Sequence, residues 1–291
     1  MMKNKKRLIV YIFWGFFSTL LFLYALFPSS LLKRAVTDSL RNYSPEFKVT
    51  FKDIRPAFPP GLKLTGVNLF HQEKEFLKAD YLKLTPGLFS LISDRKKIRV
   101  TASSLGGMFQ TSLSYKERPG GPDLFVKTDI ESIQLEKLPL EELLPGGGLK
   151  GLLDLKGEWD ISGQKVKKGE VEILLKAATV AIKSPIPDIN ALSFDTIQVI
   201  GEITNNRMEI KKGDVAGKEA DGSVTGFIDL KIPLETSALD LKGTVKPRQE
   251  FLKSIGKKFP VGLLLGKVAQ KSGVPFTVRG TIQEPEFSME R

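Results

Sequence analysis

The chain has 291 residues, of which 41% are hydrophobic, enough for one large domain or two ordinary ones with a substantial core. It contains no cysteine, which excludes disulfides and thiolate metal sites, and a single histidine, His71, which leaves most of the chain without the usual general base. With 44 basic and 33 acidic residues the net charge is +11, a balance that favours anionic partners, although lysines in the polar positions of strands account for much of it.

The first predicted element is an uncharged, apolar segment from Leu8 to Phe27. Its roughly 20 residues, at a rise of about 1.5 Å each, match a hydrocarbon core about 30 Å thick. Basic side chains in residues 1–7 place the N-terminus in the cytoplasm by the positive-inside rule. The segment is too long for the core of a cleaved signal peptide, and no cleavage site follows it. We therefore expect an uncleaved transmembrane anchor at 8–27, with the rest of the chain outside the cytoplasm, which for a two-membrane bacterium means the periplasm.

A short helix and a first group of strands are predicted next. Residues 28–45 carry apolar side chains at helical spacing up to Pro45, which indicates a juxtamembrane helix. From residue 46 to residue 145, period-2 alternation predicts the N-terminal part of a β-sheet. A Pro-Gly-Gly-Gly run then predicts a joint, so that residues 146–291 form the C-terminal part of the sheet.

The clearest local structure is an antiparallel meander in the second half. Strands at 196–204 and 207–212 flank an Asn-Asn pair, and asparagine tolerates the positive φ angles that a tight hairpin requires. Asp221-Gly222 predicts a second turn. Residues 248–272 then break the β pattern with a basic amphipathic stretch, for which two interpretations stay open: a helix on a membrane surface, or a plug at one end of the sheet.

One phrase recurs along the strands: two apolar residues at alternate positions, then a glycine, then another apolar residue on the same face. This alternation is typical of strands with one buried face, so six copies predict a long curved sheet with a continuous apolar face. The glycines either allow curvature or leave room for an acyl chain or a partner's strand. The glycines are Gly66, Gly157, Gly201, Gly226, Gly243 and Gly280, and the residues expected to line an apolar trough are Leu64, Val199, Ile228, Leu241 and Val278.

No motif indicates catalysis or cofactor binding. His71 lies in a polar connection, and the chain has no G-x-S-x-G elbow that would present a nucleophile. Residues 262–268 resemble a phosphate loop only superficially, because Val268 stands where such a loop needs a metal-binding Ser or Thr. RNP-like aromatic motifs and zinc knuckles are absent from the sequence as well. We therefore expect no catalytic residue, no metal, no cofactor and no nucleic-acid partner.

The anchor, the glycine-bearing strands and the closing segment Phe276–Phe287 together resemble type II secretion system protein N of the bacterial general secretion pathway. Residues 208–230 and 239–247 have the cadence of that family, and the pattern is also similar to the broader AsmA/TamB-like envelope proteins. The first resemblance implies a non-enzymatic, inner-membrane-anchored periplasmic component of the secretion machinery, with other secretion proteins as partners. The second implies an open β trough that shelters lipid tails, with phospholipid as the ligand.

The length of the sheet favours the first of these interpretations. About 15 strands spaced about 4.8 Å apart extend about 70 Å, which reaches only part of the way across an envelope. We therefore expect a mainly β protein in which a transmembrane helix precedes a long curved antiparallel sheet, an AsmA-like open trough, with a few short helices. Its expected function is a secretion component, and a lipid-handling module is the alternative.

Overall fold

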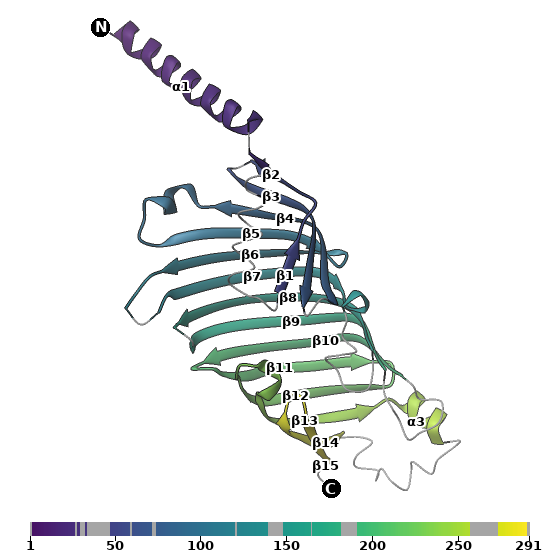
Figure 1. Ribbon diagram of the computed structural model, residues 1–291. Coiled ribbons are helices and arrows are strands. Elements are labelled where there is room, and N and C mark those ends of the chain that lie inside the picture. Colours follow the sequence, from purple (N-terminus) through teal and green to yellow (C-terminus); the bar gives the residue numbers. More distant parts are fainter. Residues whose placement is uncertain are drawn as a thin grey trace. The chain divides into compact units, whose positions relative to one another are not determined.

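The computed structural model describes residues 2–26, 28–29, 33, 47–58, 60–71, 74–119, 121–138, 148–163, 165–181, 191–256 and 273–289. This described part is mainly β, with one long helix, fifteen strands and a few short helices (Figure 1). The chain divides into two units, Met1–Pro86 and Gly87–Arg291. Most of the predicted juxtamembrane helix at 28–45, and most of the amphipathic stretch at 248–272, lie outside the described residues.

Unit 1 begins with the helix α1 (Met2–Ala25). Three of its described aromatic side chains, Tyr11, Phe13 and Trp14, are more than half exposed. Within the part of the chain that the structure describes, no helix combines the length and the apolar character needed to cross a bilayer. The transmembrane helix predicted at Leu8–Phe27 is therefore not confirmed.

Four antiparallel strands follow in unit 1. They are β1 (Phe47–Thr50), β2 (Asp53–Ala57), β3 (Gly61–His71) and β4 (Lys74–Pro86). β1 pairs with residues 68–71 of β3, and β2 pairs with residues 61–65 of the same strand. The two therefore lie along one edge of β3 as a single strand that is interrupted at Phe51-Lys52. The period-2 alternation expected from residue 46 onward did not reveal this interruption, at which the buried apolar positions shift in phase from Val49 and Phe51 to Ile54.

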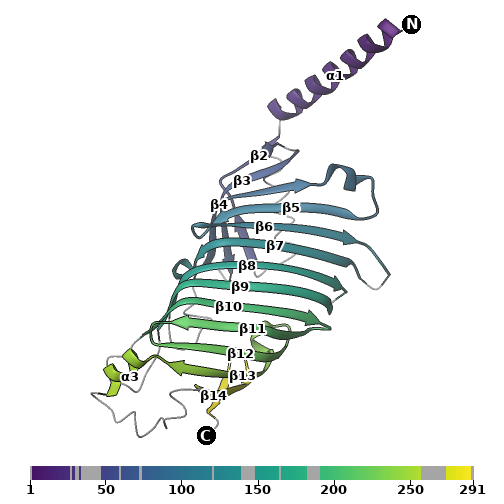
Figure 2. The same ribbon diagram turned by 180° about the vertical axis from the view of Figure 1, so that it is seen from behind.

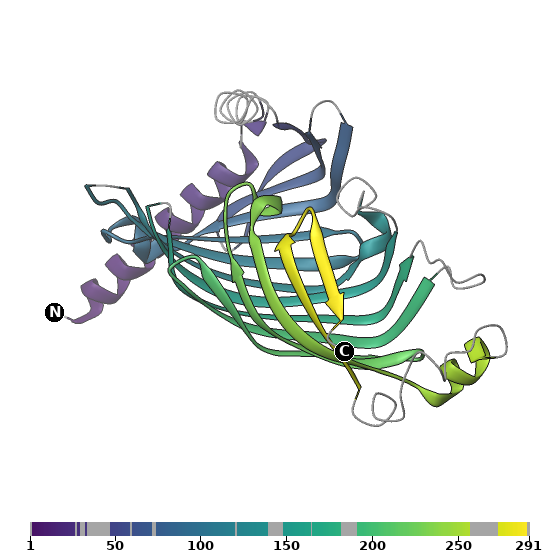
Figure 3. The same cartoon turned by 90° about the horizontal axis from the view of Figure 1, so that it is seen from below.

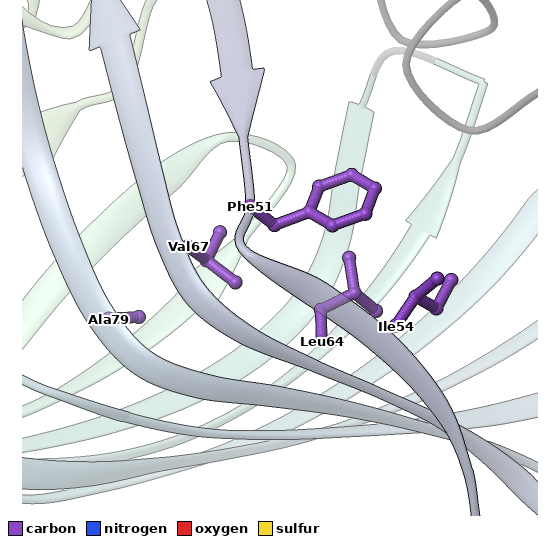
Figure 4. Packing of buried hydrophobic residues seen from close by; sticks show 5 residues of the cluster. All are labelled: Phe51, Ile54, Leu64, Val67 and Ala79. Atoms are coloured by element: carbon purple, nitrogen blue, oxygen red, sulfur yellow. The ribbon is translucent and has the colours of Figure 1, made fainter. Parts of the chain in front are cut away.

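The core of unit 1 lies around this interruption. Gly66 of β3 has a φ of 58°, in the left-handed region that glycine adopts without strain, and its position lies against the backbone and Cβ of Lys52. This local turn of the strand lets Leu64 and Val67, three residues apart, both enter one buried cluster. The cluster is shown in Figure 4, and its members are Phe51, Ile54, Leu64, Val67 and Ala79.

Unit 2 is built on eleven strands, each hydrogen-bonded antiparallel to the next in chain order. They are β5 (Lys96–Ser104), β6 (Gly107–Lys116), β7 (Asp123–Gln134), β8 (Leu149–Ser162), β9 (Lys165–Ala181), β10 (Ala191–Thr204), β11 (Arg207–Gly217), β12 (Ala220–Asp229), β13 (Ala238–Pro247), β14 (Val274–Thr281) and β15 (Pro285–Met289). The short helices are η1 (Leu88–Leu91), η2 (Leu135–Lys137), η4 (Leu234–Thr236) and α3 (Gln249–Gly256). Figure 2 shows the same simple strand order from behind.

The strands of unit 2 are bent rather than straight. Seen from below, the teal and green strands curve along their length (Figure 3). The predicted curved antiparallel sheet is therefore present in this unit.

The joint predicted between residues 145 and 146 lies between β7 and β8, which pair along most of their length within the sheet of unit 2. The turn predicted at Asp221-Gly222 is wrong: these residues belong to β12, opposite Ala216 and Val215 of β11.

The hairpin predicted at Asn205-Asn206 is confirmed. The two residues have φ angles of 52° and 63° and join β10 to β11. The Asn206 side-chain oxygen accepts a hydrogen bond from the backbone N–H of Val166 at 2.7 Å, which fastens this turn to the start of β9. The pair was recognisable because few other residues adopt two successive left-handed conformations.

Candidate functional site

The register of unit 2 shows which side chains share a face, because residues directly opposite in an antiparallel pair point to the same side of the sheet. Following the pairs from β5 to β15 traces rows of side chains across all eleven strands. Three neighbouring rows consist almost entirely of apolar residues and glycine, and we call them together the apolar face. The middle row is Val100, Thr111, Thr128, Gly157, Val171, Gly201, Ile210, Gly226, Leu241, Val278 and Phe287.

The two outer rows of the apolar face are formed mainly by large side chains. One of them is Ile98, Leu113, Val126, Trp159, Gly169, Ile203, Met208, Ile228, Leu239, Gly280 and Pro285. The other is Ala102, Phe109, Ile130, Leu155, Ile173, Val199, Gly213, Val224, Gly243, Phe276 and Met289, with a β-bulge between Gly213 and Val224. The face is therefore continuous across the unit.

Four of the five residues predicted to line a trough lie on this face. Val199 is in one outer row and Ile228 in the other, while Leu241 and Val278 are direct partners in the middle row. The fifth, Leu64, belongs instead to the buried cluster of unit 1, where it is 5% exposed. The alternation in its strand was correctly identified, but the residue is covered by neighbours of its own unit.

The glycines predicted on the apolar face are also found there, apart from Gly66 of unit 1. Gly157, Gly201 and Gly226 alternate with Val171 and Ile210 along the middle row. The two large residues are only 8% and 6% exposed, although they lie on a single sheet. The large side chains of the flanking rows therefore cover the middle row, next to the room that its glycines leave.

The space above several of these glycines is filled by the chain itself. The Trp159 ring lies over both Gly157, two residues before it, and Gly169, its partner in β9: a Cβ at either position would overlap the indole. In the same way the Met208 methyl group covers Gly201. These glycines therefore accommodate neighbouring side chains, and they do not leave open notches for a ligand.

Sequence reasoning missed this covering role. Trp159 and Phe276 each belong to a copy of the recurring phrase, and Phe276 covers Gly243 of the neighbouring strand. A large ring two residues from a glycine on the same strand face was the available signal for Trp159. For Phe276 the covered glycine, Gly243, lies on the neighbouring strand. Their proximity can be recognised only once the pairing of β13 with β14 is known, and the sequence does not give that pairing.

Among the described residues of unit 2, nothing forms a second layer over the apolar face. Every strand belongs to the one sheet, so no second sheet packs against it. Of the short helices, η1 lies against β5 and η2 against β8. Most large side chains of the face are accordingly only half-buried, and at the β15 end Phe287 and Met289 are 73% and 71% exposed. An apolar surface of this extent on water marks a site of interaction.

The opposite face of unit 2 is polar and charged. Glu158, Glu170, Glu202 and Glu209 are successive partners across β8 to β11. Directly opposed like charges are destabilising, and lysines offset them here. Lys127 pairs with Glu158. Lys211 binds Glu209 at 2.8 Å and Glu202 at 3.6 Å.

The charges of this polar face neutralise one another. The hydrogen bond to Glu158 raises the pKa of Lys127, and the hydrogen bond to Glu209 raises the pKa of Lys211. A shallow depression of about 270 Å³ lies beside the acidic row, lined in part by Glu170 and Glu202. Across the described ranges, no three His, Asp or Glu side chains lie close enough together to hold a metal ion. The row is a solvated, ion-paired surface.

Comparison with known proteins finds no matching family model, no matching curated protein and no matching solved structure. What the apolar face can bind is therefore inferred from its own residues. It offers hydrophobic contacts along a broad surface, and none of the residues of its three rows pairs a nucleophile with a general base. Such a surface binds apolar chains or another apolar surface.

Proposed function

We propose that the chain is a non-enzymatic envelope protein that shelters the acyl chains of lipids on the apolar face of unit 2. The observation that carries this proposal is the continuity of three apolar rows across eleven strands without a second described layer. Burying one methylene contributes about 0.8 kcal/mol, so covering about eight methylenes of an acyl chain contributes on the order of 6 kcal/mol.

The proposal includes a position at the bacterial inner membrane, with the N-terminus cytoplasmic and the bulk of the chain periplasmic. It is supported by the basic residues that precede the apolar run and by the exposure of Phe13 and Trp14 on α1. An exposed aromatic surface of this kind requires a lipid or protein partner to cover it. Cell fractionation, with a periplasm-specific enzyme fused after residue 291, tests this part: activity of the fusion in the membrane fraction is the expected result.

The lipid-binding part is tested by mass spectrometry of the full-length protein purified from cells. We expect co-purified phospholipid, and its loss in the double variant Val199→Asp plus Leu241→Asp, which places two charges on the apolar face. The matched control is Thr196→Asp plus Thr225→Asp, because both threonines are exposed on the polar face and each lies opposite a lysine. Equal lipid content in both double variants would overturn the proposal.

A component of the type II secretion system is the second candidate, favoured by the edge strand β15. All five of its residues are exposed, and among the described strands it pairs only with β14. A free strand edge with apolar side chains suits strand addition by a partner protein. Deletion of the gene is expected to reduce secretion of exoproteins, and secretion genes are expected beside it. If deletion leaves secretion intact and the purified protein carries no lipid, both candidates fail.

A further inference from the structure

The last strand of unit 2 has one edge that pairs with no other described strand. β15 pairs with β14 alone, and its five residues are all exposed. Phe287 and Met289, which continue two rows of the apolar face, are 73% and 71% exposed. An edge that carries unpaired backbone groups is a template for pairing with another chain.

The backbone groups that β15 directs to this edge follow from the turn before it. The Thr281 N–H donates to the Glu284 carbonyl at 3.2 Å and closes the β14–β15 turn. Hydrogen-bonded and non-hydrogen-bonded pairs alternate along an antiparallel ladder, so every second residue of β15 directs its N–H and C=O away from β14. These residues are Pro285, Phe287 and Met289. Phe287 and Met289 therefore offer both donors and acceptors to a further strand, while Pro285 offers only its carbonyl.

The sequence of β15 is complementary to itself in antiparallel orientation. A register centred on Phe287 places this residue opposite its counterpart in a second copy of the chain. Pro285 then lies opposite Met289, and Glu286 lies opposite Ser288. Opposite residues of an antiparallel pair point to the same side of a sheet. The apolar residues of both copies therefore share one face, and the polar residues share the other.

Neighbouring registers fit less well. A shift by one residue would place Glu286 opposite Phe287 and mix polar with apolar side chains on each face. A shift by two residues in one direction would place Glu286 opposite Glu286, and like charges directly opposite each other are destabilising. The same shift in the other direction would leave Pro285 and Glu286 without partners in β15 of the second copy. The register centred on Phe287 pairs all five residues of the strand.

We propose that β15 binds β15 of a second copy of this chain in antiparallel orientation, with the twofold axis at Phe287. The two Phe287 rings then form a directly opposed aromatic pair, which stabilises antiparallel strands. The pairing joins the two sheets edge to edge and continues the apolar face from one copy into the other. This inference goes beyond the proposed function, because it is independent of what the apolar face carries.

Disulfide trapping tests both the pairing and its register, because the chain contains no cysteine. Full-length Glu286→Cys and Ser288→Cys proteins, one of them carrying a mass tag, are mixed in nonionic detergent and mildly oxidised. The mixture is expected to form disulfide-linked heterodimers. Neither protein alone is expected to cross-link, because identical positions lie about 8 Å apart in this register, beyond the roughly 7 Å that a disulfide spans. Phe287→Cys alone is expected to cross-link, since this position faces its own counterpart.

Two further substitutions assign the cross-link to the paired strands. Phe287→Asp, added to both proteins of the mixture, is expected to lower the yield about tenfold, because two carboxylates would face each other at the centre. Phe58→Asp is the matched control, since Phe58 of unit 1 is 89% exposed, and the yield is expected to stay unchanged. Equal cross-linking of each single variant with itself and with the other, or an equal loss in the control, would overturn the proposal. Absence of cross-links at all three positions would also overturn it and would leave the edge open to a different protein.

Discussion

Trp159 is the residue on which the packing of the apolar face depends most directly. Its distal ring atoms lie over Gly157 and its proximal ring atoms over Gly169, so one side chain fills the room left by two glycines. A planar indole cannot yield locally, because any movement away from one glycine moves it against other side chains of its row. Met208 over Gly201 differs, since the closest atom is the methyl group at the flexible end of the side chain, and the next neighbours, the Glu209 carbonyl and the Met208 Cγ, lie at 3.3 and 3.4 Å from a Cβ at this position.

This contrast predicts different costs for two similar substitutions. Gly157→Ala is expected to lower the free energy of unfolding by about 1–3 kcal/mol and to shift the emission of Trp159, because the new methyl group displaces the ring. Gly201→Ala is expected to cost less than about 1 kcal/mol, because the Met208 methyl group can rotate away. Urea unfolding followed by circular dichroism measures both, and equal losses would contradict the packing described here.

Asp154 supports a bulge at the end of β7. Its carboxylate accepts the backbone N–H of Ser132, a non-glycine residue with a φ of 57°, at 2.7 Å, and it binds Lys176 at 2.6 Å. The Lys176 ammonium and the Ser132 N–H lower the pKa of this carboxyl below its ordinary value of 3.8. A depressed pKa stabilises the folded state above the ordinary value, and this contribution is lost as the pH falls through the folded-state pKa.

Asp154→Ala is therefore expected to lower the free energy of unfolding by about 1–2 kcal/mol at neutral pH. The difference from the unmodified protein should shrink as the pH is lowered below 3.8. Asp160→Ala serves as the control, since this exposed residue of the same strand forms no ion pair among the described residues and should change stability little. Unfolding measured at a series of pH values decides the question; a gap that is constant with pH would refute the assigned role.

At the scale of elements, the β10–β11 turn connects more than its own two strands. Asn206 bonds to Val166 at the start of β9 through its side chain and its backbone, and its carbonyl accepts the Leu230 N–H beyond the end of β12 at 2.8 Å. One turn residue therefore fastens two further elements. Such contacts keep the turns at this end of the strands in line.

Asn206→Ala is expected to destabilise the protein by about 1–3 kcal/mol, because it removes the side-chain hydrogen bond and places alanine at a positive φ. Asn206→Gly tolerates the backbone conformation and loses only the hydrogen bond, so its cost is expected to be smaller. Thermal unfolding of the two variants separates the contributions. A larger loss for glycine than for alanine would show that the left-handed conformation is unimportant here.

The elements also show what sequence patterns can predict. The strands, the Asn205-Asn206 turn and the apolar phase of the glycine phrases follow from local alternation and backbone preference. The turn at residues 218–219 was missed because Asp221, which looks like a turn residue, instead accepts the Gly217 N–H and pairs with Arg248. The interruption of the first strand and the burial of Leu64 depend on Gly66 and on partners in other strands. Long-range register decides these features, and alternation alone does not contain it.

At the scale of the whole molecule, the strands of unit 2 contact mainly their neighbours in sequence. A sheet of this kind, without a described second layer, resembles a repeat array in which stability is the sum of nearest-neighbour terms. The candidate site is accordingly spread over many strands, and no single residue defines it. This is why the apolar face was predictable from the sequence as a pattern, without knowledge of which strands lie side by side.

We expect unit 2 to unfold in stages rather than in one cooperative step. In protein carrying Trp14→Phe, Trp159 in β8 reports one region, and a fluorescent label on Thr277→Cys in β14 reports another, in a chain that otherwise lacks cysteine. The two probes are expected to give different urea midpoints, because the regions are joined only through the intervening strands. Coincident midpoints would show that the sheet is cooperative throughout.

The continuity of the three rows has a consequence for how proteins of this design vary in size. Each additional hairpin would extend the rows by two strand spacings, about 10 Å, without changing how many rows there are. The number of strands sets the length of the apolar surface, and the length of each strand sets its width. The two dimensions are independent, so a longer apolar surface requires only duplication of a hairpin.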